Sequence, residues 1–94
     1  MPRYLLERVF TVGQEQMNAV GRRSRQIATE RYPSIRWEHS HVVLDDDGMV
    51  RTFCVYSGPN EDELLKHAAD LGDHTVLRIS EIVGDVTPDD FPPS

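Results

Sequence analysis

The sequence predicts a ferredoxin-like α+β domain, a four-stranded antiparallel sheet with two helices on one face in the order βαββαβ. Two stretches with helical spacing of apolar residues enclose two β-rich stretches, and a further β-rich stretch lies towards each end. The 94 residues suffice for one domain only. We assign residues 1–84 to this domain and residues 85–94, which carry three of the six prolines, to an irregular C-terminal arm.

The first half of the chain predicts a strand followed by a long helix. Residues 4–10 form an apolar run with two interior charges and little helical period, which indicates a strand. From Gly13 to about Arg31, apolar and small side chains recur at helical spacing. They are Met17, Val20, Ser24, Ile27 and Ala28. Pro33 ends this helix because it excludes the helical conformation from the residue before it.

Residues 35–44 and 49–57 predict a β-hairpin, because both are rich in β-branched and aromatic residues. The Asp47-Gly48 pair between them favours a tight turn. We expect a loop of even length, which sets His41 opposite Cys54 and His39 opposite Tyr56. The open face of the sheet then gathers His39, His41, Cys54, Tyr56 and Trp37. The core under the helices takes Phe53, Val55, Val42 and Leu44.

The last third predicts a second helix and a final strand. Asn60, followed three residues later by Glu63, is typical of the start of a helix, and Gly72 is typical of its end. The expected buried stripe of this helix is Leu64, Leu65, Ala68 and Leu71. Residues 75–83 are again β-rich.

Charge and composition exclude several classes of function. A net charge of −6 and a pI near 5.0 argue against binding to nucleic acid or to a membrane surface. We find no run of 18 apolar residues and no signal peptide, so we expect a cytoplasmic protein. The single cysteine excludes an internal disulfide and an all-cysteine zinc site within one chain.

His39 and His41 are the first candidate metal ligands. Alternation along a strand points them to the same face, about 6.6 Å apart along the chain, so both imidazoles could reach one ion. Cys54, water or a partner chain could supply further ligands. The alternative is a structural or interface role for the pair. Asp45–Asp47 read as solvated turn residues, since adjacent aspartates do not match a calcium loop.

His67 and His74 form a second candidate set. His67 lies on the second expected helix, beside its buried stripe, and His74 follows Gly72 in the next connection. If the strand parity is right, neither can meet His39 and His41 within one chain. Each alone is also compatible with an ordinary surface histidine.

Three segments of the chain carry a family resemblance: "MPRYLLERVF", "RTFCVYSGPNEDELLKHAADLG" and "RISEIV". Together they resemble the bacterial domain-of-unknown-function family four-two-four-two, which includes small nickel-binding proteins. The resemblance covers about residues 3–83. It implies a ferredoxin-like fold and a homodimer packed through its sheets, and it places His67 and His74 near histidines of the nickel-binding members.

The sequence therefore predicts a small homodimer that binds a divalent transition metal, with nickel favoured, for storage or sensing rather than turnover. The candidate ligands are His39, His41, His67 and His74. One alternative is an enzyme of the dimeric α+β barrel type, in which His41 acts as an acid or base with Tyr56. Another is a ligand-free protein-interaction module.

Overall fold

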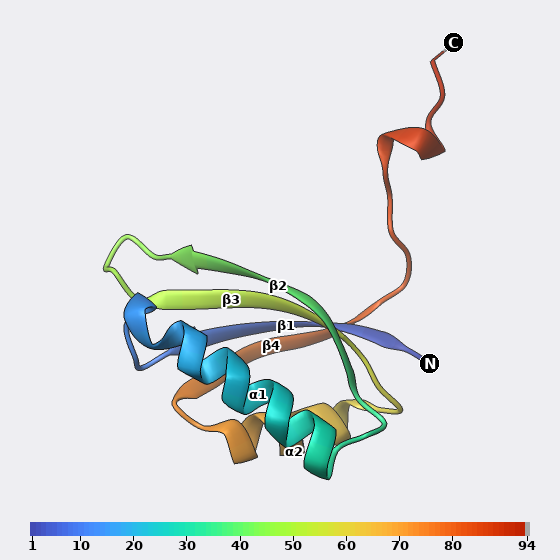
Figure 1. Ribbon diagram of the computed structural model, residues 1–94. Helices are drawn as coiled ribbons and strands as arrows, with labels where there is room; N and C mark the ends of the chain where they lie inside the picture. Colours follow the sequence, from blue (N-terminus) through green and yellow to red (C-terminus); the bar gives the residue numbers. More distant parts are fainter. Residues whose placement is uncertain (94) are drawn as a thin grey trace.

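The computed structural model describes residues 1–93 and has the predicted element order. The strands are β1 (Arg3–Phe10), β2 (Arg36–Leu44), β3 (Val50–Ser57) and β4 (His74–Ile82), and the main helices are α1 (Met17–Arg31) and α2 (Glu61–Leu71). The antiparallel sheet has the order β2-β3-β1-β4. Both helices cover one of its faces (Figure 1). The predicted ferredoxin-like fold is confirmed.

The local signals at the ends of α2 act as expected, but its buried face differs from the prediction. The Asn60 side chain accepts a hydrogen bond from the Glu63 backbone N–H at 3.0 Å, and Gly72 ends the helix with a positive φ of 71°. Leu65, expected in the core, is 40% exposed. His67 is fully buried instead, which corrects the expectation of a surface histidine.

The expected register of the hairpin was wrong. The connection between β2 and β3 has five residues, Asp45 to Met49, so Leu44 pairs with Val50, His41 with Phe53 and His39 with Val55. Backbone hydrogen bonds from Asp45 N to Met49 O and from Gly48 N to Asp45 O close this odd loop, with Gly48 at φ 82°. An odd loop exchanges the faces of β3 relative to β2.

The exchange moves several side chains from the face expected for them. Cys54 and Tyr56 lie under the helices, whereas Phe53 and Val55 lie on the open face. A β-bulge between Trp37 and His39 brings Trp37 opposite Tyr56, so it also lies on the helix side. Two further residues expected in the core, Val42 and Leu44, remain 50% and 55% exposed on the edge strand β2.

The core between sheet and helices has two apolar clusters. One contains Tyr4, Leu6, Ile35, Cys54, Tyr56 and Leu64, and the other contains Phe10, Val20, Val50 and Leu71. The buried polar and charged residues are Arg8, Ser24, Thr52 and His67. Arg8 is the cross-strand partner of Thr52, and the His67 ring bonds to Ser24. Alternation on β1 sets Arg8 between Leu6 of one cluster and Phe10 of the other.

The chain after β4 leaves the sheet on the side opposite the helices (Figure 1). Arg3 forms an ion pair with Asp85 at its root, and Val83, Val86 and Phe91 are largely exposed. Ser94 lies outside the described residues, and the division of the chain at residue 84 stays a prediction. Within residues 1–93, no helix is both long and apolar enough to cross a membrane.

Candidate functional site

His39 and His41 form a pair of exposed imidazoles on the open face of the sheet. Their ring centroids lie 5.5 Å apart and the ring planes meet at 81°. Their partners on β3, Val55 and Phe53, face the same way and form an apolar floor beside them. Because neither ring is enclosed, both can turn towards one ion, as the spacing predicted.

The other residues near this pair supply no further free ligand within one chain. The Glu38 carboxylate accepts hydrogen bonds from Arg3 Nε at 3.0 Å and from Ser57 Oγ at 2.6 Å, and these bonds hold its pKa below the ordinary value. Cys54 is buried on the other face, where its thiol lies 3.4 Å from Thr52 Oγ1. Residues 1–93 contain no cluster of three or more His, Cys, Asp or Glu side chains that could hold a metal ion.

His67 is enclosed between α1, α2 and the sheet. Its Nε2 lies 3.0 Å from the Ser24 carbonyl oxygen, which can only accept, so Nε2 carries a proton. The Nδ1 atom is buried without a hydrogen-bond partner, and the rings of Tyr32 and Tyr56 lie 5.9 Å away. Burial lowers the pKa of His67, and the positive charge of Arg8 lowers it further against the opposing effect of the Ser24 bond.

His74, the first residue of β4, is half-buried against Phe10 at a ring distance of 5.0 Å. Its Nδ1 donates to the Gly72 carbonyl oxygen at 2.7 Å, which leaves Nε2 with its lone pair. Metal-bound histidines are commonly oriented by such a bond to a backbone carbonyl. Burial lowers the pKa of His74 as well, with a smaller contribution from Arg8.

The four predicted ligands therefore divide into two sets on opposite sides of the sheet. His39 and His41 are brought together on the open face, whereas His67 and His74 lie on the helix side. The acid–base pair expected for an enzyme is not formed, because the exchanged register puts His41 and Tyr56 on opposite faces.

The burial of Arg8 under the helices was not predicted, since the charges of Glu7 and Arg8 on the first strand were expected to form ion pairs at an interface or to line a polar pocket between subunits. Arg8 is 2% exposed, and within residues 1–93 no carboxylate forms an ion pair with it. Its Nη2 donates a long hydrogen bond of 3.4 Å to the Tyr56 hydroxyl, and its Nε has no partner. An ion buried without a counter-charge is unfavourable. Removing one partner of a buried ion pair, for comparison, destabilises a protein by about 3–5 kcal/mol. Arg8 thus brings a positive charge without an acidic partner in the described part of the chain to the helix side of the sheet, where its guanidinium carbon lies 5.4 Å from the centroid of the Tyr56 ring.

Comparison with protein families gives a decisive match. A family model described as "Nickel responsive protein SCO4226-like" matches residues 4–82, which is most of the chain. The chain belongs to the SCO4226-like family. The resemblance seen in the sequence used a different family designation, and both designations connect the chain with nickel.

One solved structure supports the fold assigned to this member of the SCO4226-like family. The C-terminal domain of the MgtC protein from Mycobacterium tuberculosis superposes with a TM-score of 0.61 at 13% identity, over 89% of this chain and 88% of that one. At that identity the likeness concerns the fold alone. No curated protein sequence matches the chain significantly.

Proposed function

We propose that this protein binds nickel through His39 and His41 on the open face of its sheet, as a storage or sensing protein. The observation that carries the proposal is the exposed pair of imidazoles, with ring centroids 5.5 Å apart, in a member of a nickel-responsive family. Imidazole nitrogens are suitable ligands for nickel. The pair is accessible without any rearrangement of the core.

Two imidazoles do not complete a metal site, and we propose that a second copy of the chain supplies the rest. The open face is partly apolar, since Leu5 and Val43 are 39% and 40% exposed. Two sheets packed through this face would bury that surface and add to the modest stability of a domain of this size. A two-fold axis near β2 would bring two His39–His41 pairs together.

His67 and His74 are weaker ligand candidates than the exposed pair. Each keeps one ring nitrogen without a proton, Nδ1 in His67 and Nε2 in His74, because the other nitrogen donates to a backbone carbonyl. The free nitrogen of His67 is buried, so a metal could reach it only if the helices moved from the sheet. We therefore assign His67 a structural role and retain His74 as a secondary ligand candidate.

Calorimetric titration with nickel chloride at about pH 7.5 tests the assignment. The double variant His39→Ala/His41→Ala should lose at least about 100-fold in affinity, whereas the matched variant His67→Gln/His74→Gln should stay within about 10-fold of the wild type. Protons compete for the same nitrogens, so wild-type affinity should fall between about pH 7.5 and pH 6. Nickel binding of equal strength by the His39→Ala/His41→Ala variant would refute the proposal.

The mass in solution tests the dimer separately. Light scattering of the wild-type protein should give twice the chain mass of 10.7 kDa. Leu5 lies on the open face and is 39% exposed, so replacing it with Asp would place a charge there and should yield monomers that bind nickel more weakly than the wild type. A monomeric wild-type protein that still binds nickel tightly would contradict the shared site but not the ligand assignment.

A further inference from the structure

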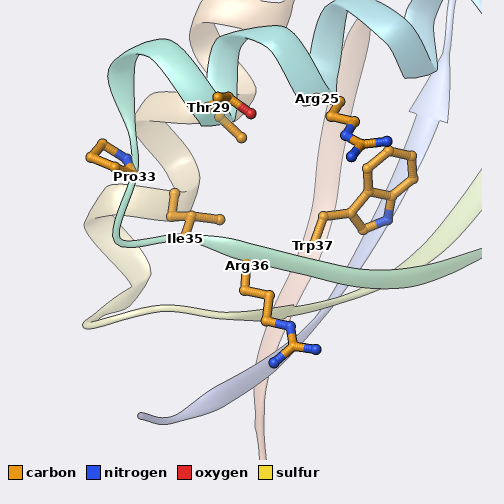
Figure 2. Close-up of a pocket in the computed structure, with 7 residues that line it drawn as sticks. Arg25, Thr29, Pro33, Ile35, Arg36 and Trp37 are labelled. Atoms are coloured by element: carbon orange, nitrogen blue, oxygen red, sulfur yellow. The ribbon is translucent and has the colours of Figure 1, made fainter.

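A groove at the edge of the sheet carries an arrangement of side chains that the nickel proposal does not use. It lies between the C-terminal half of α1 and the start of β2 and encloses about 470 Å³ (Figure 2). Ala28, Ile35 and Trp37 give it apolar walls, and Arg25, Thr29 and Arg36 line the remainder. We call it the edge groove. Small-molecule sites commonly enclose about 300–1,000 Å³.

The arginines beside the edge groove lack acidic partners, although the protein as a whole is acidic. On α1, Arg23 pairs with Asp73 and Arg31 with Asp70. In contrast, no carboxylate of residues 1–93 forms an ion pair with Arg22, Arg25 or Arg36. Among the described residues, Arg25 is therefore an unpaired cation at the groove of a chain whose net charge is −6.

Two of the lining side chains converge. The Arg25 guanidinium lies beside the Trp37 indole, whereas the Arg36 side chain extends to the other side of β2 (Figure 2). Trp37 is held in place, because its Nε1 donates to Ser40 Oγ at 2.9 Å and its ring stacks on Tyr56 at a centroid distance of 6.5 Å. The indole nevertheless stays 37% exposed. A fixed aromatic surface thus adjoins an unpaired, planar cation.

We infer that the edge groove binds a small planar carboxylate, with Arg25 pairing with the carboxylate and the ring packing against Trp37 and Ile35. Arginine binds carboxylates through two parallel hydrogen bonds, and an indole offers a flat apolar surface to a planar ring. The groove lies on the helix side of the sheet, away from His39 and His41, so this site is independent of the proposed nickel site.

The C-terminal arm of the chain also carries carboxylates and an aromatic ring, in Asp89, Asp90 and Phe91. The C-terminal segment leaves the domain on the side opposite the helices, so it points away from the groove of its own chain (Figure 1). We therefore assign the groove to a free ligand rather than to the arm. The arm of a second copy is the competing occupant, and the dilution experiment below separates the two.

Benzoate is a suitable probe, and Trp37 reports on it directly because it is the only tryptophan of the chain. Titration of the full-length protein with benzoate at low salt should change the tryptophan fluorescence saturably, with a Kd on the order of 1 mM. Acetate lacks the ring and benzyl alcohol lacks the charge, so each should bind at least about 10-fold more weakly. The absence of a saturable change with benzoate would overturn the inference.

Two matched variants test the role assigned to Arg25. Arg25→Gln should weaken benzoate binding at least about 10-fold, whereas Arg22→Gln, which makes the same charge change one turn away on α1, should stay within about 2-fold of the wild type. Circular dichroism checks that both variants are folded. Equal benzoate binding by Arg25→Gln and the wild type would overturn the inference.

The titration is repeated over a range of protein concentrations. A benzoate Kd that does not depend on protein concentration supports a free ligand. A Kd that decreases on dilution would mean that the arm of another copy competes for the groove, and the assignment to a free small molecule would then be wrong.

Discussion

The two faces of the sheet hold histidines under opposite conditions. On the open face, His39 and His41 are exposed and lie side by side over Val55 and Phe53. On the helix side, His67 and His74 each donate one ring N–H to a backbone carbonyl and are wholly or partly buried. The comparison shows that two conditions decide whether a histidine can bind a metal ion. One ring nitrogen must be free of a proton and of other partners, and the ion must be able to reach it.

The helix side also differs from the open face in its charge. Arg8 lies buried among the core side chains, and its charge contributes to lowering the pKa of both His67 and His74. On the open face, by contrast, the Arg51 guanidinium is paired with two carboxylates, with Glu7 at 3.0 Å and with Asp45 at 3.0 Å. The interior therefore favours the neutral form of His67 and His74, which pack against the core. On the open face, His39 and His41 remain accessible to an ion.

The largest effect that we expect comes from removing the buried ring of His67. His67→Ala should lower the free energy of unfolding by about 3 kcal/mol, because it leaves a cavity and removes the hydrogen bond to Ser24. His67→Gln fills more of the space and can still donate to Ser24, so its loss should be about half as large. Urea unfolding measures both. A loss below about 1 kcal/mol for His67→Ala would contradict a structural role.

Sequence reasoning predicted the order of the elements but not the register of the hairpin. The helix signals at Asn60 and Gly72 act over a few residues, so they can be read locally. The face of β3 depends on whether the loop after Leu44 has an even or an odd number of residues, and both kinds of loop use a glycine such as Gly48. The bulge that turns Trp37 towards the helices left no comparable signal.

The same distinction explains which parts of the site were foreseen. His39 and His41 share a face in any register, because they lie two residues apart on one strand. The expected neighbours Cys54 and Tyr56 depended on the register and were misplaced. Arg8 could have been found, since β1 alternates and Arg8 shares its face with the buried Leu6 and Phe10.

The next effect concerns Arg8 and should have the opposite sign. Arg8→Met keeps much of the side-chain volume and removes a buried charge that lacks an acidic partner within residues 1–93. We expect the free energy of unfolding to rise by about 1–2 kcal/mol. The change also removes a positive charge near His67 and His74, so their pKa values should rise, as NMR titration would show. A less stable variant would mean that Arg8 is compensated by a group such as a bound anion.

A smaller effect should appear in the dependence of stability on pH. The pKa values of His67 and His74 are lowered in the folded state, so the unfolded chain binds protons first as the pH falls below about 6.5. The stability that these histidines contribute is complete above that pH and is lost as the pH falls towards the lower folded-state pKa. Urea unfolding at pH 7.5, 6.5 and 5.5 would measure this change.

A double variant separates this effect from that of the carboxylates. His67→Gln/His74→Gln should show a smaller loss of stability between about pH 6.5 and pH 5.5 than the wild type, because it lacks both lowered histidines. Identical slopes for the wild type and His67→Gln/His74→Gln would show that the buried histidines do not resist protonation.

The smallest effect is expected on the open face in the absence of metal. His39→Ala/His41→Ala removes two exposed rings, so the free energy of unfolding should change by no more than about 0.5 kcal/mol. Added nickel should then separate the proteins, because a ligand that binds only the folded state raises its stability, by about 2.7 kcal/mol at 100 times its Kd. The wild type should gain this stability and the variant should not. Equal stabilisation of both proteins by nickel would move the binding site away from His39 and His41, with His74 as the next ligand to test.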